Sequence, residues 1–189
     1  MANEIKRQTI HVLFYFLAFG FKFLSRWQVV GILLLMLFCT IFLIPKSKIR
    51  FHLYRRLEQK YSQGAIAYFL VLLVIVLVFP VTAAAVALAI LALGDGMATL
   101  IGKSFKTKEL PWNQNKSFGG LVAFLVFGLI GAVSVLCWMD PSLSISQALF
   151  IGIKTVVVAA IVESLPWKIN DNISVPLVSA IVLNFLLAV

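Results

Sequence analysis

The sequence is poor in charged residues, which make up 12% of its 189 positions, and it contains seven acidic residues in all. A soluble domain carries about a quarter charged residues, so this scarcity excludes an ordinary soluble globular domain. Hydrophobic residues make up 62% of the chain, and that excess excludes an intrinsically disordered protein. The two cysteines, Cys39 and Cys137, both lie in apolar runs, so we expect neither a disulfide framework nor a cysteine metal cluster. What remains is an integral membrane protein.

The apolar residues are grouped into runs of the length that a membrane-spanning helix needs, or somewhat shorter. These runs cover residues 10–24, 27–44, 65–79, 81–101, 119–138, 145–163 and 175–189. We therefore predict an all-α fold: a polytopic transmembrane helix bundle of about seven spans, forming a single domain over residues 1–189. Residues 46–64 are basic, with Phe51, Tyr54, Leu57 and Tyr61 at helical spacing. That pattern predicts a basic interfacial helix between the second and third spans.

The sixteen Lys and Arg residues exceed the acidic residues by nine and are distributed unevenly between the two sides of the predicted bundle. Thirteen of them lie at the N-terminus or in the loops after the second, fourth and sixth spans, whereas Lys22 and Arg26 lie on the other side and Lys154 lies within a span. Basic loops stay on the cytoplasmic side, so we expect a cytoplasmic N-terminus and a C-terminus on the opposite side. The basic face is expected to contact anionic lipid and not nucleic acid. The sequence carries no signal for an oligomeric state.

Three of the scarce acidic residues are placed where one site could use them all. Asp95 lies inside an apolar run, which is costly for a carboxylate unless it is paired, binds a metal or faces water. Glu163 ends the sixth run and Asp171, followed by Asn172, precedes the seventh, so the topology brings all three carboxylates to one membrane face. Carboxylates together with phosphate oxygens and water suit Mg²⁺. Two simpler interpretations stay open: Asp95 pairs with Lys154 or Lys103 in helix packing, and Asp171 caps the last helix.

The segment before the fifth span has the composition of an anion site. Asn115, Lys116 and Ser117 are followed by Phe118, Gly119 and Gly120. A helix N-terminus with free amides, glycines that permit close approach and a lysine together favour phosphate binding. The sequence contains neither a P-loop nor a protein-kinase motif set. The small residues Ala98, Thr99 and Gly102 share one helix face with Asp95 and would let a ligand or a second backbone approach. Lys6, Arg7, His11 and Lys103 are candidate accessory contacts; His11 is also typical of an interfacial histidine.

The segments GDGMATLIGK (94–103), ELPWNQNKSFGG (109–120) and ESLPWKINDNISVPL (163–177) resemble the CTP-dependent polyprenol kinase family. That family includes dolichol, phytol and farnesol kinases, and a CTP-dependent diacylglycerol kinase is related to it. The resemblance extends from Glu4 to the C-terminus and is closest to the phytol and farnesol kinase branch. The family's nucleotide pattern, D-x-x-A-x-x-x-G followed by K-[TS]-x-x-G, is matched by Asp95, Ala98, Gly102, Lys116, Ser117 and Gly120. The chain departs from the dolichol kinases at Lys106, at Asn115-Lys116 and at Gly119-Gly120, where they have a glycine, a doubled lysine and a Glu-Gly pair.

The resemblance implies transfer of the γ-phosphate of a nucleoside triphosphate, expected to be CTP, to the hydroxyl of a membrane isoprenoid alcohol such as phytol, geranylgeraniol, farnesol or a longer polyprenol. It implies a Mg²⁺-dependent site at the cytoplasmic face. Asp95, Asp171 and Glu163 are expected to hold the metal, and Asp95 or Glu163 to accept the alcohol proton. Lys116 and the amides of Gly119 and Gly120 are expected to hold phosphates, with Ala98, Gly102, Ser117 and Asn172 completing the nucleotide site.

Three alternative functions stay open on the sequence. Two are enzymatic: a CTP-dependent diacylglycerol kinase, and a membrane cytidylyltransferase that would release pyrophosphate. The third is a small transporter, which Asp95 and Lys154 inside apolar runs would suit. The gathering of polar residues at one face, and not at the midplane of an inverted repeat, argues against transport.

Overall fold

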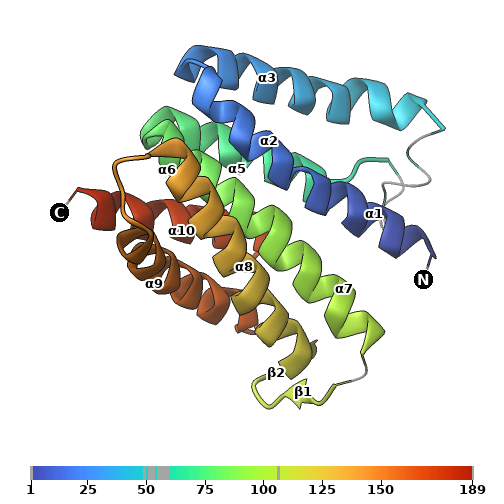
Figure 1. Cartoon of the computed structure of the whole chain (residues 1–189). Helices are drawn as coiled ribbons and strands as arrows, with labels where there is room; N and C mark the ends of the chain where they lie inside the picture. Colours follow the sequence, from blue (N-terminus) through green and yellow to red (C-terminus); the bar gives the residue numbers. More distant parts are fainter. Residues whose placement is uncertain (1, 49, 51–53, 55–59, 106, 189) are drawn as a thin grey trace.

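The computed structural model describes residues 2–48, 50, 54, 60–105 and 107–188, and within these residues the chain is a helical bundle that carries one short hairpin (Figure 1). The predicted all-α membrane bundle is thereby confirmed as a fold class. The helices are α1 (Ala2–Leu13), α2 (Tyr15–Gly20), α3 (Arg26–Phe38), α5 (Gln63–Val78), α6 (Val81–Ala89), α7 (Gly96–Ser104), α8 (Phe118–Met139), α9 (Ile145–Ser164) and α10 (Asp171–Leu187). Short 3₁₀ or π turns cover η1 (Phe21–Phe23), η2 (Cys39–Leu43), η3 (Ile44–Lys46) and η4 (Ile90–Asp95).

Four continuous helical segments among the described residues are long and apolar enough to cross a membrane. They are Arg26–Lys46, Val81–Ser104, Phe118–Met139 and Ile145–Ser164, whereas α5 and α10 are apolar but shorter. The predicted first span is divided, because α1 ends at Leu13 and α2 begins at Tyr15. Seven crossings therefore stay a prediction, with four of the helices meeting the length that a crossing requires.

The fourth apolar run contains Gly94-Asp95-Gly96 and forms one continuous helical segment. The helix continues from α6 through the π turn η4 into α7. Gly94 packs against α8 there: a Cβ built on it would lie 3.2 Å from the Cα of Gly128. The glycines therefore permit close helix packing and do not end the helix. Asp95 lies within this continuous helical segment.

The core of the bundle is built around α6. Its residues Ala83–Ala89 are each at most 2% exposed, and α2, α5, α8 and α10 all contact this helix. Alanine side chains let these neighbours approach closely. Large apolar side chains remain on the outer faces, among them Trp27 at 72% and Phe185 at 70% exposed. An apolar outer surface over a close-packed centre is the arrangement expected of a protein whose surroundings are lipid.

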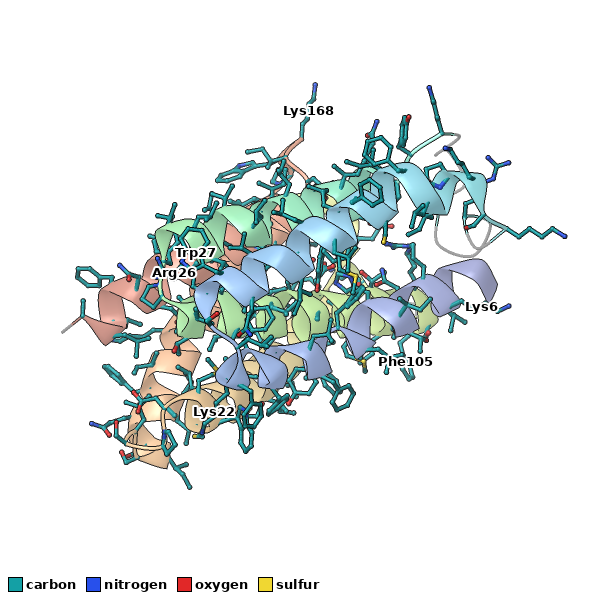
Figure 2. The ribbon with its side chains drawn as sticks, turned by 90° about the horizontal axis from the view of Figure 1, so that it is seen from above. Lys6, Lys22, Arg26, Trp27, Phe105 and Lys168 are labelled. Atoms are coloured by element: carbon teal, nitrogen blue, oxygen red, sulfur yellow. The ribbon has the colours of Figure 1, made fainter. Side chains whose placement is uncertain are left out.

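The two ends of the bundle differ in character. The N-terminus and the hairpin β1 (Glu109–Leu110) and β2 (Asn113–Ser117) lie at one end, whereas the α8–α9 connection and the C-terminus lie at the other (Figure 1). Lys6 lies at the first end and Arg26 and Trp27 at the second (Figure 2). Lys6 and Arg26 thus lie at opposite ends of the bundle, whereas the predicted division of the other basic residues between two membrane sides stays a prediction. The predicted interfacial helix falls largely on residues outside those described.

Candidate functional site

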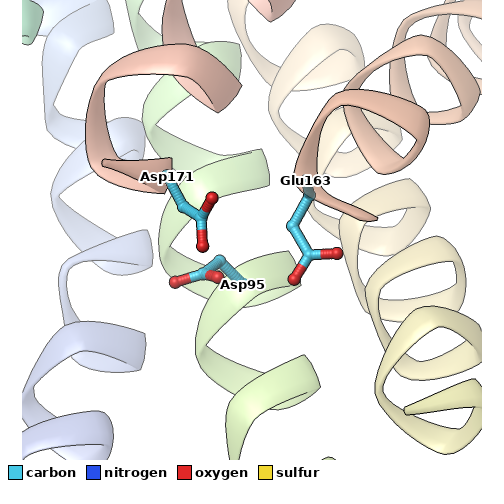
Figure 3. Close-up of side chains that lie close together, drawn as sticks. All are labelled: Asp95, Glu163 and Asp171. Atoms are coloured by element: carbon cyan, nitrogen blue, oxygen red, sulfur yellow. The ribbon is translucent and has the colours of Figure 1, made fainter. Parts of the chain in front are cut away.

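Three carboxylates converge at the hairpin end of the bundle (Figure 3). Asp95 ends the π turn η4, Glu163 lies in the last turn of α9, and Asp171 is the first residue of α10. One oxygen atom from each carboxylate lies within 4.8 Å of the others. Asp95 and Glu163 are buried, at 8% and 3% exposed. The sequence-based expectation that helix ends bring these three acids together agrees with this geometry.

Asn170 occupies the cap position that one interpretation of the sequence assigned to Asp171. The side-chain oxygen of Asn170 accepts a hydrogen bond from the N–H of Asn172 at 3.1 Å, which satisfies an amide at the start of α10. Asp171 therefore enters the first turn of the helix, and its carboxylate points toward Asp95 and Glu163 (Figure 3).

Lys116 brings a positive charge into the carboxylate cluster. Its Nζ donates to Oε1 of Glu163 and, at 2.8 Å, to Oδ2 of Asp171. Burial lowers the pKa of Lys116, but the charges of Glu163, Asp95 and Asp171 outweigh it, so the pKa lies above its ordinary value. Lys116 therefore stays a cation. Three carboxylates and one ammonium leave a formal charge of −2 when all are ionised, which suits a divalent cation with oxygen ligands.

Asp95 has a histidine neighbour that the helix-packing interpretation with Lys154 or Lys103 did not include. Its Oδ2 lies 3.7 Å from Nε2 of His11, whose ring nitrogen also lies 3.1 Å from the carbonyl oxygen of Leu91. The ammonium of Lys154 lies 3.8 Å above the ring of Phe150, on an exposed face of α9. His11 thus lies next to Asp95 and outside the cleft wall, whereas Lys154 lies on the outer surface of the bundle.

The hairpin that carries Lys116 is tied to the end of α9. Asn113, which is 7% exposed, donates from Nδ2 to the carbonyl oxygens of Ser164 and Leu165, each at 3.1 Å. Nε1 of Trp112 donates to Oγ of Ser164 at 3.3 Å. These bonds set β2 directly beside the turn that contains Glu163. Sequence reasoning missed Asn113, because its partners are backbone carbonyls that no residue spacing reveals.

The amides assigned to phosphates are engaged in local hydrogen bonds at the start of α8. Ser117 is the N-cap, and its Oγ accepts from the N–H of Gly120 at 3.2 Å. The N–H of Gly119 donates to Oγ1 of Thr107 at 2.9 Å. The hydroxyls of Ser117 and Thr107 are thus turned toward the two amides. Thr107 was absent from the sequence-based candidates, although it lies twelve residues from Gly119 in the same polar loop.

The small residues of the nucleotide pattern let α7 and α8 pack backbone to backbone. A Cβ built on Gly102 would lie 3.0 Å from Oγ of Ser117, and one built on Gly120 would lie 3.2 Å from the carbonyl oxygen of Ala98. Larger side chains would separate the two helices. Ala98, Gly102 and Gly120 therefore place Asp95 and Lys116 on the same cleft.

The three carboxylates, Lys116 and the small residues between α7 and α8 line one cleft of about 1360 Å³. Its volume exceeds the roughly 300–1,000 Å³ of an ordinary small-molecule site, so it has room for more than one ligand. The sequence-based candidates in its wall are Arg7, Asp95, Ala98, Gly102, Lys103, Lys116, Ser117, Gly120, Glu163, Asp171 and Asn172. Nδ2 of Asn172 donates to the carbonyl oxygen of Gly64 at 2.8 Å, which ties α10 to α5. Lys6, His11 and Gly119 do not line the cleft within the described part of the chain.

Comparison with known proteins gives sequence relatives only: no protein-family model and no solved structure matches the chain. The chain is 37% identical over 135 residues to the probable phytol kinase, chloroplastic, of Triticum aestivum, a match that covers 66% of this chain and 44% of that protein. It is 36% identical over 100 residues to the farnesol kinase, chloroplastic, of Arabidopsis thaliana, covering 48% and 31%. It is 30% identical over 102 residues to phytol kinase 1, chloroplastic, of the same plant, covering 49% and 32%. The chain spans less than half the length of these relatives.

Proposed function

The chain belongs to the polyprenol kinase family, with relatives among the phytol and farnesol kinases, and on that premise we propose that it phosphorylates the hydroxyl of a membrane isoprenoid alcohol. The phosphate donor in this proposal is a nucleoside triphosphate, namely CTP, with Mg²⁺ as the metal. The observation that carries the proposal is the cluster of Asp95, Glu163 and Asp171 around the ammonium of Lys116 in one cleft. Phosphoryl transfer depends mainly on positioning and on charge neutralisation, and this cleft offers groups for both.

The carboxylates supply the ligands that a magnesium ion would need. Asp95, Glu163 and Asp171 present hard oxygen donors that lie within 4.8 Å of one another, which fits Mg²⁺. When bound, the ion would neutralise charge on the phosphate oxygens. Asp95 or Glu163 accepts the proton of the alcohol. At the same time the alcohol oxygen forms the new bond to the γ-phosphorus, and the bond between the γ-phosphorus and the leaving nucleoside diphosphate breaks.

The start of α8 receives the triphosphate. The ammonium of Lys116 neutralises phosphate charge, and the helix N-terminus favours an anion. The Oγ of Ser117 and Oγ1 of Thr107 accept from the amides of Gly120 and Gly119, so each hydroxyl can donate its own proton to a phosphate oxygen. The nucleotide then lies along Ala98 and Gly102, where short side chains leave space, and toward Asn172.

The membrane orientation follows the charge distribution. We place the N-terminus and the cleft on the cytoplasmic side, with the C-terminus on the opposite side, and the basic loops against anionic lipid. The alcohol is an apolar chain with a single hydroxyl, so it reaches the cleft from the bilayer while the nucleotide arrives from water.

A transfer assay with labelled nucleotides tests the function. The purified protein in nanodiscs is given CTP, UTP, ATP or GTP labelled at the γ-phosphate, together with phytol, farnesol, geranylgeraniol or diacylglycerol. We expect label on an isoprenoid alcohol; label on diacylglycerol instead would assign the acceptor to the related lipid kinase. A parallel series labelled at the α-phosphate detects cytidylyl transfer, which would refute the kinase.

The variant Asp95→Asn tests the site itself. It should remain folded and lose at least a thousandfold in transfer rate, because a neutral amide neither holds the metal nor accepts a proton. Asp140→Asn is the matched control, since Asp140 follows α8 at the opposite end of the bundle and should leave the rate unchanged. Near-normal transfer by Asp95→Asn would exclude the carboxylate cluster as the active site.

A further inference from the structure

Helix α1 forms one wall of the cleft. A Cβ built on Gly96 would lie 2.6 Å from Cγ2 of Val12 and 3.2 Å from Cδ2 of His11, so α1 packs directly on the start of α7. The two helices run in opposite directions (Figure 1). The side chain one turn before His11 and Val12 therefore lies on the hairpin side of Asp95, where a nucleotide bound by its phosphates would extend. That side chain is Gln8, and it lines the cleft.

Gln8 has an unused hydrogen-bond acceptor. The residue is 2% exposed, and its Oε1 has no hydrogen-bond partner among the described residues. A buried carbonyl oxygen without a partner is costly, so native proteins rarely keep one unless a ligand or water meets it. Gln8 lies in the wall of the cleft, so a substrate group bound there can supply the missing donor.

The chemistry of the substrates narrows the choice of partner. Ionised phosphates have no proton to donate to Oε1. The alcohol has one hydroxyl proton, and the carboxylates must remove it. An exocyclic amine on a nucleobase has two protons, and phosphoryl transfer consumes neither. The ribose hydroxyls also keep their protons, but every ribonucleotide carries them, so an exocyclic amine is the donor through which Gln8 would distinguish one base from another.

The same cleft contains an aromatic side chain suited to a base. Tyr61 lines the cleft before α5 and is 38% exposed, so part of its ring is accessible. Bases stack on such rings. The ammonium of Lys60 lies 5.3 Å from the ring centroid and adds positive charge beside it. A stacking surface and an orphan acceptor thus lie in one cleft with the phosphate-binding groups.

We infer that Gln8 and Tyr61 form a nucleobase subsite, in which Oε1 of Gln8 accepts from the exocyclic amine of the base and the Tyr61 ring stacks on it. This rests on the proposed function, because it assumes a nucleoside triphosphate in the cleft. Gln8 therefore favours CTP over UTP, which carries a carbonyl in place of the amine at the same ring position. Two carbonyl oxygens facing each other repel, so the preference has an attractive and a repulsive part.

Equilibrium titration with CTP and UTP tests the subsite without requiring turnover. The full chain in nanodiscs is titrated with each magnesium nucleotide. Wild type should bind CTP more tightly, and Gln8→Leu should reduce the CTP-to-UTP affinity ratio about five- to tenfold, the range expected for one lost hydrogen bond. Lys116→Ala is the control: it should weaken both nucleotides and leave the ratio unchanged.

A second variant keeps the test independent of the fold around Gln8. Tyr61→Leu should weaken CTP and UTP alike by at least fivefold, whereas Tyr61→Phe should bind as wild type does. Equal affinities of wild type for CTP and UTP, or an unchanged ratio in folded Gln8→Leu, would overturn the subsite. An increased KM for the alcohol alone in Gln8→Leu would assign the acceptor to the alcohol instead. A wild type that prefers CTP yet transfers no phosphate would refute the proposed kinase and keep the subsite.

Discussion

Replacing Lys116 with methionine should destabilise the protein, because its ammonium neutralises a carboxylate that has little access to solvent. Nζ donates to Glu163, whose side chain is 4% exposed, and to Asp171, whose side chain is 36% exposed. Breaking a buried ion pair by removing one partner costs about 3–5 kcal/mol. Because the Lys116 side chain is 24% exposed, and Asp171 more so, we expect about 3 kcal/mol, at the lower end of that range.

A double-mutant cycle isolates the pair. Glu163→Gln keeps the shape of the side chain and removes its charge, and the double variant carries neither charge. Because the double variant leaves no buried charge unpaired between these two residues, its loss should be smaller than the sum of the single losses by about 2 kcal/mol.

Thermal unfolding in detergent with EDTA measures the cycle in the absence of divalent ions. A loss of about 3 kcal/mol lowers Tm by roughly 6–12 °C in a chain of this size. Lys108→Met, an exposed lysine in the same loop, is the control and should change Tm by less than about 2 °C. Additivity of the two substitutions within about 0.5 kcal/mol would refute the reasoning, since it would mean that the two charges do not interact.

Three further predictions concern the hydrogen bonds of Asn113, the packing of Gly96 and the pKa of Lys116. Asn113→Ala removes two hydrogen bonds to the end of α9 and should cost about 2 kcal/mol by thermal unfolding and weaken nucleotide binding; unchanged nucleotide affinity would contradict this. Gly96→Ala should lower Tm, because its Cβ would lie 2.6 Å from Val12, and Val12→Ala should restore much of the loss, whereas no restoration would place the strain elsewhere. The pKa of Lys116 is raised, so Lys116 should keep its proton, and its contribution to nucleotide affinity should stay constant from pH 8 to pH 10. A fall in affinity over this range that occurs in wild type and not in Lys116→Met would show that Lys116 loses its proton there.

The carboxylate cluster could be predicted because charge inside an apolar segment is expensive. Asp95 lies in an apolar run, and Glu163 and Asp171 border two others, so the cost of burial singles them out one by one. Counting the spans then puts the three at one end. The hydrogen bonds of Asn113 could not be predicted in this way, because an asparagine in a polar loop is ordinary until its carbonyl partners are known.

Two local features depend on packing between elements that are separate in the sequence. Gly94 and Gly96 flank Asp95 within the helix, and they pack closely against α8 and α1. The loop before α8 contains a hairpin, because its strands pair and Asn113 fastens it to α9. Neither effect is visible in local propensity, since both depend on a second element.

Composition and the spacing of apolar runs determined by themselves that this chain is a helical membrane bundle, because a long apolar segment must satisfy its own backbone hydrogen bonds in lipid. The sequence also indicated that Asp95, Glu163, Asp171 and Lys116 are the candidate functional residues. Only the tertiary structure decided that Lys116 contacts Glu163 and Asp171. It also decided that Gln8, whose side-chain oxygen has no hydrogen-bond partner among the described residues, lines the same cleft. Such contacts join residues far apart in the chain, and the packing of several helices sets them.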